Sequence, residues 1–160
     1  MQTVRTTLLL LSVLLFTAHL TLAQDKPETE TRVTMRDLPP AVQQTVREQR
    51  KGAVLLGLAK EVENGQTFYE AELKVNGHNK DVLIDPTGKI VEIEEQVTLD
   101  SLPAAVKTEI VRQAGKRRIL LVESITKDNA IVAYEAHVRT GRRMSEIKID
   151  PEGKPIPIGK

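Results

Sequence analysis

The side chains that could bind a metal are few and lie far apart in the sequence. His78 and His137 are the histidines beyond residue 23, and a metal site needs histidine, cysteine, aspartate or glutamate at ligand spacing. We place His78 in a turn and His137 on the outward face of a strand, so both are expected to face solvent. Asp85 and Asp150 begin predicted turns, where aspartate bonds its own backbone, and the Asp-x-Asp ladder of a calcium loop is missing. The sequence therefore predicts no metal and no cofactor.

Patterns for nucleophilic and acid–base catalysis are also missing. Ser101, Ser124 and Ser145 stand outside the Gly-x-Ser-x-Gly context of a nucleophile elbow. Glu70 and Glu72 lie on one face of a predicted strand, where solvent gives both carboxylates similar pKa values. Acid–base catalysis needs groups whose pKa values are pushed apart. We therefore expect that the protein is not an enzyme.

The segments that position these side chains occur twice in the chain, as an internal repeat. The matched segments are VTMRDLPPAV at 33–42 and VTLDSLPAAV at 97–106, YEA at 69–71 and 134–136, and IDPTGK at 84–89 and IDPEGK at 149–154. Each copy begins with a capping residue (Asp37 or Ser101) followed by proline and apolar residues at helical spacing. Strand-like alternation then follows, interrupted by turn pairs such as Asn64-Gly65.

This pattern predicts an α+β fold of two tandem repeats, each with one helix packed on a four-stranded antiparallel meander sheet. Repeat 1 would span residues 33–96 and repeat 2 residues 97–160. Because a unit of about 64 residues is small for independent stability, we expect the two units to share a common core. Each helix would cover one face of its sheet, so the opposite, outward face is the candidate surface for binding another protein. The residues expected there are Phe68, Glu70, Glu72, Leu83 and Ile90 in repeat 1, and Ile131, Glu135, His137 and Arg139 in repeat 2.

The first 23 residues are typical of a signal peptide. Arg5 precedes an aliphatic run at 8–15, and small residues at Thr21 and Ala23 favour cleavage before Gln24. An uncleaved N-terminal anchor is the alternative; after cleavage no membrane span is expected. Residues 24–32 are polar and predict a disordered lead-in. The expected location is therefore periplasmic or secreted, and without cysteine the fold is held by its core alone or by the joining of its two modules.

Charge and aromatic content exclude some partners. Residues 24–96 carry 10 bases and 14 acids, whereas residues 97–160 carry 12 bases and 8 acids. The resulting charges of −4 and +4 favour packing of the halves or self-association, and the oligomeric state stays open. A neutral mature chain with 2% aromatic residues lacks the positive charge and stacking platforms of nucleic-acid binders.

The ordered motifs resemble the PepSY-like family: Leu-Pro-x-Ala-Val opening a helix, Tyr-Glu-Ala in a strand, and Asp-x-x-Gly-Lys in a hairpin. The resemblance covers residues 33–94 and 97–155. It implies a fold similar to the β-lactamase inhibitory protein and a non-enzymatic binding or inhibitory module outside the cytoplasm. The implied partner is an exported protein such as a peptidase. Two alternatives from the residues stay open: a self-associating structural or stress-related envelope protein, and a small-ligand or cation sensor.

Overall fold

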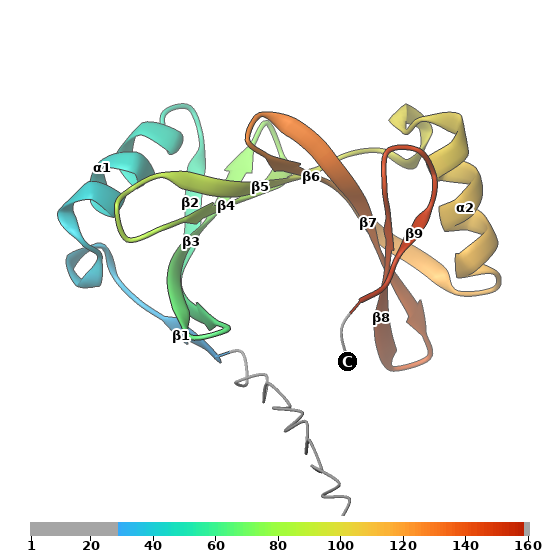
Figure 1. Ribbon diagram of the computed structural model, residues 1–160, viewed down its shortest axis with the longest axis horizontal. Coiled ribbons are helices and arrows are strands. Elements are labelled where there is room, and N and C mark those ends of the chain that lie inside the picture. Colours follow the sequence, from blue (N-terminus) through green and yellow to red (C-terminus); the bar gives the residue numbers. More distant parts are fainter. Residues whose placement is uncertain (1–28, 159–160) are drawn as a thin grey trace, which may run out of the picture.

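The computed structural model describes residues 29–158 and forms an arched sheet with one helix near each end (Figure 1). The predicted signal peptide and residues 24–28 lie outside the described residues. The strands are β1 Thr29–Arg32, β2 Val54–Glu63, β3 Gln66–Val75, β4 His78–Ile84, β5 Ile90–Gln96, β6 Arg118–Lys127, β7 Ala130–Thr140, β8 Arg143–Ile149 and β9 Pro155–Ile156. The helices are α1 Pro40–Gln49 and α2 Ala104–Ala114, each preceded by a 3-10 turn, η1 Met35–Asp37 and η2 Leu99–Ser101.

The predicted fold class, two repeats that each pack one helix on a four-stranded meander, is wrong. The chain forms one nine-stranded antiparallel sheet with strand order β1 to β9. Its centre is the pairing of β5 with β6, in which Ile93 lies opposite Thr126 and Gln96 opposite Glu123. Two separate sheets would each leave an edge of unpaired N–H and C=O groups at this point. Pairing β5 with β6 removes both edges. Short-range sequence patterns do not indicate this pairing.

The N-terminal edge of the sheet also differs from the prediction. Residues 29–32, expected to belong to a disordered lead-in, form β1 and pair with residues 59–62 of β2. All four residues are exposed, so their polar composition suits an edge strand as well as a disordered segment. The backbone pairing with β2 orders this segment, although its side chains carry no strand pattern.

The apolar interior is divided into two cores, so the expected common core is also wrong. Val42 and Val46 of α1 pack with Leu73 and Ile84 of the sheet in the first core. A second set of buried residues joins α2 to β6–β8 and contains Val106, Ile110, Val122, Val138 and Ile149. The strand pairing of β5 with β6 connects the two cores.

Both helices lie on the same face of the sheet. Ile93 of β5 packs against the first core, and Val97, four residues later, packs against the second. Residues at even spacing in a strand point to the same face, so the two cores share one side. The opposite face is the inner side of the arch, and no helix within residues 29–158 covers it (Figure 1). We call it the helix-free face.

Each helix starts one turn later than its predicted cap. Asp37 instead is the last residue of η1 and forms a capping box with Thr34, the N-cap of that turn: its Oδ2 accepts hydrogen bonds from the backbone N–H and the hydroxyl of Thr34, at 2.8 and 2.6 Å. Pro39 then stands at the N-cap of α1 and Pro103 at that of α2. No helix within residues 29–158 is long and apolar enough to cross a membrane.

The turn between β4 and β5 contacts α1 closely. Gly88 has a φ of +89°, and a Cβ placed there would lie 2.9 Å from the carbonyl oxygen of Ala41. The hydroxyl of Thr45 donates a 2.7 Å hydrogen bond to the Gly88 carbonyl. Asp85 caps this turn by accepting the backbone N–H of Thr87 at 2.8 Å, as predicted. The turn thereby fixes α1 against the sheet.

Two β-bulges shift the alternation of side chains and move two predicted surface residues. Between β4 and β5, Leu83 pairs with Glu92 but Ile84 pairs with Ile90. The extra residue places Ile90 on the helix side, where it packs against the first core. Strict alternation therefore assigned Ile90 to the wrong face.

Ile131 is misplaced for the same reason. A second bulge, between β6 and β7, leaves Ile131 opposite Thr126. Thr126 pairs in turn with Ile93, which packs against the first core. By register Ile131 therefore lies on the helix side of the sheet, where it is 44% exposed, and not on the helix-free face.

Candidate functional site: an acidic sheet face

The helix-free face carries carboxylates at directly opposed positions on neighbouring strands. Glu72 of β3 lies opposite Asp81 of β4, and Asp81 lies opposite Glu94 of β5. We call the surface formed by these residues and their neighbours on β2, β3 and β5 the acidic face. Its members are Glu61, Glu70, Glu72, Asp81, Glu92 and Glu94. Like charges placed directly opposite each other destabilise a sheet, so this arrangement does not serve the fold.

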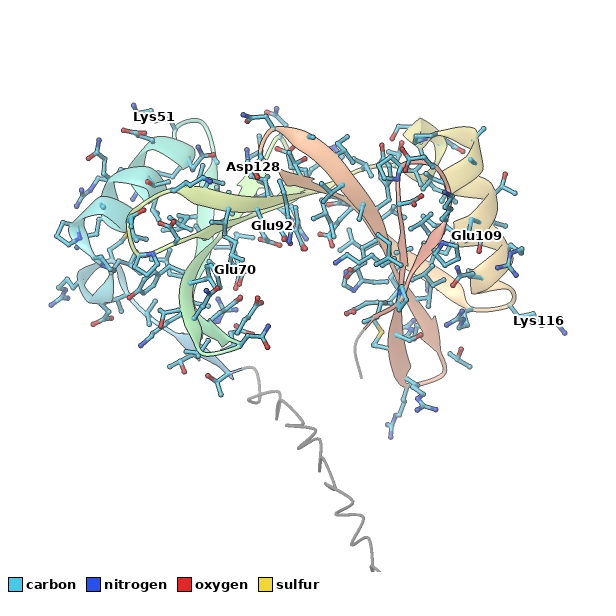
Figure 2. All side chains as sticks on the ribbon, in the orientation of Figure 1. Lys51, Glu70, Glu92, Glu109, Lys116 and Asp128 are labelled. Carbon is cyan, nitrogen blue, oxygen red and sulfur yellow. The ribbon has the colours of Figure 1, made fainter. Side chains whose placement is uncertain are left out.

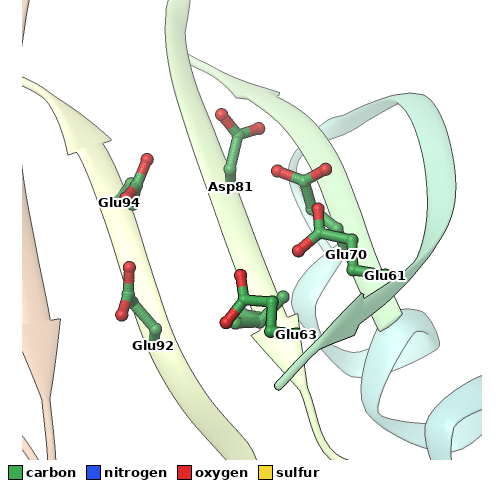
Figure 3. A pocket seen from close by; sticks show the side chains of 7 residues that line it. Glu61, Glu63, Glu70, Asp81, Glu92 and Glu94 are labelled. Carbon is green, nitrogen blue, oxygen red and sulfur yellow. The ribbon is translucent and has the colours of Figure 1, made fainter. Parts of the chain in front are cut away.

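The acidic face is hollowed into a pocket of about 200 Å³. Its lining consists of Glu61, Glu63, Glu70, Asp81, Leu83, Glu92 and Glu94 (Figure 3). Figure 2 shows Glu70 and Glu92 on the inner side of the arch. A single apolar side chain, Leu83, stands among six carboxylates, so the pocket suits a cationic group far better than an apolar ligand.

Burial and mutual repulsion hold protons on this face. Burial is the largest cause that raises the pKa of Glu70 to about 8, and the nearby charges of Glu61 and Asp81 contribute to the same rise. Burial also raises the pKa of Glu94 to about 8, with a hydrogen bond shared with Glu92 as the next cause. Glu94 lies opposite Ile125, which is 1% exposed, so one side of its carboxyl is dry. The pKa of Asp81 rises to about 6, again mainly through burial.

Two basic side chains neutralise part of the face at its margins. Nη1 of Arg32 lies 2.6 Å from Oε1 of Glu72, and Lys127 of β6 pairs with Glu92. The arginine crosses β2 at Gly57, where a Cβ would lie 2.0 Å from Nη1 of Arg32. The missing side chain of Gly57 therefore leaves room for Arg32 of the edge strand to reach Glu72. The row from Asp81 to Glu94 keeps its excess of carboxylates.

A second polar group occupies the helix-free face on β6, β7 and β8. We call it the histidine cluster; its members are Glu123, Glu135, His137 and Glu146. Nε2 of His137 lies 3.1 Å from Oε2 of Glu123 and 3.5 Å from Oε1 of Glu135. The hydrogen bond to Glu123 is the largest cause that raises the pKa of His137, and the charge of Glu135 adds to it. His137 lies on the outward face of β7, as predicted, but its side chain is only 28% exposed, so solvent reaches part of the ring.

The structure brings together part of the predicted binding surface. Glu70 and Leu83 line the acidic pocket, Glu72 adjoins it, and Phe68 contributes to a neighbouring pocket with Val91. Glu135 and His137 belong to the histidine cluster, and Arg139 follows on β7, opposite Arg118. Ile90 and Ile131 leave this surface because of the bulges.

Sequence reasoning missed the residues at the centre of the face. Asp81, Glu92 and Glu94 were not predicted, although they alternate with the inward Val82 and Ile93 and so had to point outward. Glu123 had no comparable signal. It is 4% exposed, because β6 pairs with β5 and is no longer at an edge.

Comparisons with known proteins place the fold. No family model and no curated protein matches the chain. A protein from Bacteroides eggerthii DSM 20697, provisionally described as periplasmic, is 20% identical with a TM-score of 0.61, over 75% of this chain and 86% of that chain. A DUF2874 family protein from Bacteroides ovatus ATCC 8483 is 22% identical with a TM-score of 0.57, over 76% and 86%.

A BLIP-like protein from Bacteroides fragilis NCTC 9343 is similar at 17% identity and a TM-score of 0.54, over 75% of this chain and 84% of that chain. The fold is BLIP-like. Identities at this level show the fold alone. The description of the first structure agrees with the predicted location outside the cytoplasm. The PepSY-like family is not named by these structures, and that resemblance stays a prediction.

Proposed function

We propose that the chain is an exported, non-catalytic binding module whose acidic face binds a basic surface of another exported protein. The observation that carries the proposal is the opposed row of Glu72, Asp81 and Glu94 on a sheet face that no helix in the described part of the chain covers. The repulsion between these carboxylates destabilises the folded sheet. A partner that supplies positive charge removes their repulsion, so binding and stability are coupled.

Long-range electrostatics favours the same interpretation. A hollow surface lined by one sign of charge concentrates field lines and attracts the opposite charge. Complementary charge across an interface raises the association rate and rejects wrong partners. The acidic face therefore selects for lysine- or arginine-rich surfaces and against acidic ones.

The BLIP-like fold supports a finer form of the proposal. One structural neighbour is described as BLIP-like, and the sequence motifs resemble a family in which inhibitory modules occur. We infer that binding blocks or regulates an exported enzyme, and a peptidase with a basic rim is the partner class that we favour. In this form the protein itself performs no chemistry.

Site-specific photo-cross-linking in the native cell envelope tests the proposal. A photoreactive residue at Leu83, inside the acidic pocket, is compared with one at Gln44, which is exposed on α1. We expect one discrete protein adduct from position 83, none of the same mass from position 44, and loss of the adduct when Asp81→Asn and Glu94→Gln are combined with it.

Two results would count against the proposal. Equal amounts of adduct from positions 83 and 44 would mean that other proteins contact the chain without preferring the acidic face. An adduct from position 83 that survives neutralisation of Asp81 and Glu94 would mean that charge does not select the partner. Sedimentation of the purified chain shows whether the adduct joins two copies of the same protein, which would favour the self-associating alternative.

A further inference from the structure

The histidine cluster differs in chemistry from the acidic pocket, because it contains an imidazole. One ring nitrogen of His137 and one oxygen each of Glu135 and Glu146 lie within 4.8 Å of one another. The three residues come from adjacent strands, β7 and β8, and His137 lies directly opposite Glu146 in the register. The backbone pairing therefore holds the three donors together without any need for close spacing in the sequence.

A buried carboxylate fixes the orientation of the imidazole. Glu123 is 4% exposed, and its Oε2 lies 3.1 Å from Nε2 of His137. When Nε2 carries the proton and donates it to Glu123, the lone pair of the ring is on Nδ1. Nδ1 faces Glu146, whose Oε1 is 3.9 Å away. Metal-binding histidines commonly donate their other ring N–H to a carboxylate in this way.

A lysine holds the second carboxylate in place. Nζ of Lys148 lies 3.2 Å from Oε2 of Glu135, and the other oxygen, Oε1, lies 3.5 Å from Nε2 of His137. Lys148 also offsets part of the negative charge that Glu123, Glu135 and Glu146 bring together. One carboxylate oxygen stays directed at the ring while the other is neutralised.

We propose that the histidine cluster binds a divalent transition-metal ion of the Zn²⁺ type. Nδ1 of His137 and Oε1 of Glu146 already face each other, Glu135 turns its Oε1 from Nε2 toward Nδ1 to become the third protein ligand, and water completes the coordination. Glu123 is a positioning residue that holds the ring through Nε2. Zinc ligands lie about 2.0–2.2 Å from the metal, which sets the donors roughly 3–4 Å apart. Nδ1 of His137 and Oε1 of Glu146 are 3.9 Å apart and so already approach this spacing.

The donor set selects the class of metal. Calcium and magnesium prefer oxygen ligands, and those ions would favour the acidic pocket, whose donors are all carboxylates. Imidazole suits zinc, copper and nickel. The histidine cluster and the acidic pocket are therefore distinguishable by the metals that they bind. The metal site uses other residues than the partner-binding proposal and does not rest on it.

Isothermal titration of the mature chain, produced without a histidine tag, with Zn²⁺ tests this site. We expect one equivalent of Zn²⁺ to bind, and His137→Gln to weaken binding at least tenfold. His78→Gln is the matched control, because His78 is exposed at the start of β4, and it should bind as the unaltered chain does. Glu146→Gln, at a side chain that is 44% exposed, keeps the fold intact and should weaken binding in the same direction as His137→Gln.

Substitution of Co²⁺ supplies an independent spectroscopic readout. A visible absorption band of Co²⁺ with nitrogen and oxygen ligands is expected in the unaltered chain and in His78→Gln, and is lost in His137→Gln. The proposal is overturned if Zn²⁺ fails to bind, or if binding is the same in His137→Gln as in the unaltered chain. It is also overturned if millimolar Ca²⁺ displaces Zn²⁺ fully, because the metal would then occupy the acidic pocket.

Discussion

Asp81 and Glu94 lie directly opposite each other on β4 and β5, on the face of the sheet opposite to α1 and α2. The carboxylate row continues through Asp81 to Glu72 on β3. On the other side Glu94 lies opposite the buried Ile125. Repulsion within this row and burial beside an apolar strand both disfavour ionisation, and both effects disappear when the chain unfolds. Stability, protonation and partner binding are thus linked through the same residues.

The first prediction concerns the pH dependence of stability. The pKa values of Glu70 and Glu94 are raised from 4.5 to about 8, and that of Asp81 from 3.8 to about 6. Between the ordinary and the raised pKa of each group, the carboxyl is protonated in the folded chain but ionised in the unfolded chain. The free energy of unfolding therefore falls as pH rises through that range. His137, whose pKa is also raised, contributes in the same direction.

We therefore expect a higher melting temperature at pH 5 than at pH 8, measured by circular dichroism at constant ionic strength. Added salt should reduce the difference by screening the carboxylates. A melting temperature that rises steadily from pH 5 to pH 8 would contradict the raised pKa values.

The second prediction compares two adjacent glutamates on opposite faces of β5. Glu94→Gln removes one charge from the carboxylate row and should raise stability at pH 8 by up to about 1 kcal/mol, the size of a cross-strand pair interaction. At pH 5 the gain should vanish, because Glu94 is already protonated there. Chemical unfolding at the two pH values measures both effects.

Glu95→Gln is the matched control. Glu95 points to the helix side, and its Oε1 lies 3.1 Å from Nζ of Lys80. Its removal should lower stability by at most about 1 kcal/mol, as expected for an exposed ion pair, with no gain at pH 8. Equal effects of the two substitutions would mean that the face on which a carboxylate lies does not matter.

The third prediction concerns the contact between α1 and the turn that follows β4. Gly88→Ala places a methyl group 2.9 Å from the Ala41 carbonyl at a φ of +89°, and should destabilise the chain by about 2–4 kcal/mol. Gly52→Ala is the control, since Gly52 has a φ of +76° but no neighbour within 4 Å. It should cost about 1–2 kcal/mol.

The difference between these two glycine variants isolates the packing contact from the backbone conformation. Equal losses of stability in urea unfolding would show that α1 is not fixed by the turn.

Local features of this fold are readable from the sequence. The turn pairs at Asn64-Gly65 and Asn76-Gly77 adopt positive φ at all four residues, as the residue types predict. Ala71 and Leu73 are fully buried, as their alternation predicts. Such features depend on neighbours within a few residues, which is the range that a sequence pattern can report.

Long-range strand pairing is not readable in this way. The pairing of β5 with β6 joins residues about 30 positions apart, and it buries Glu123, which no local pattern indicates. The bulge beside Ile90 adds a single residue and so places Ile90 on the helix side of the sheet. The acidic face was therefore predicted only through Glu70, Glu72 and Leu83, and its centre at Asp81 and Glu94 became visible with the register.

The most direct test of the acidic face is a titration of the isotope-labelled mature chain with an arginine-rich peptide, followed through backbone amide resonances. Binding at the acidic face predicts shifts concentrated on β3, β4 and β5 around Glu70, Asp81 and Glu94. These shifts should be lost in high salt and in the combined Asp81→Asn, Glu94→Gln variant. Shifts spread over α1 and α2, or unchanged by that variant, would contradict a basic partner bound at this face.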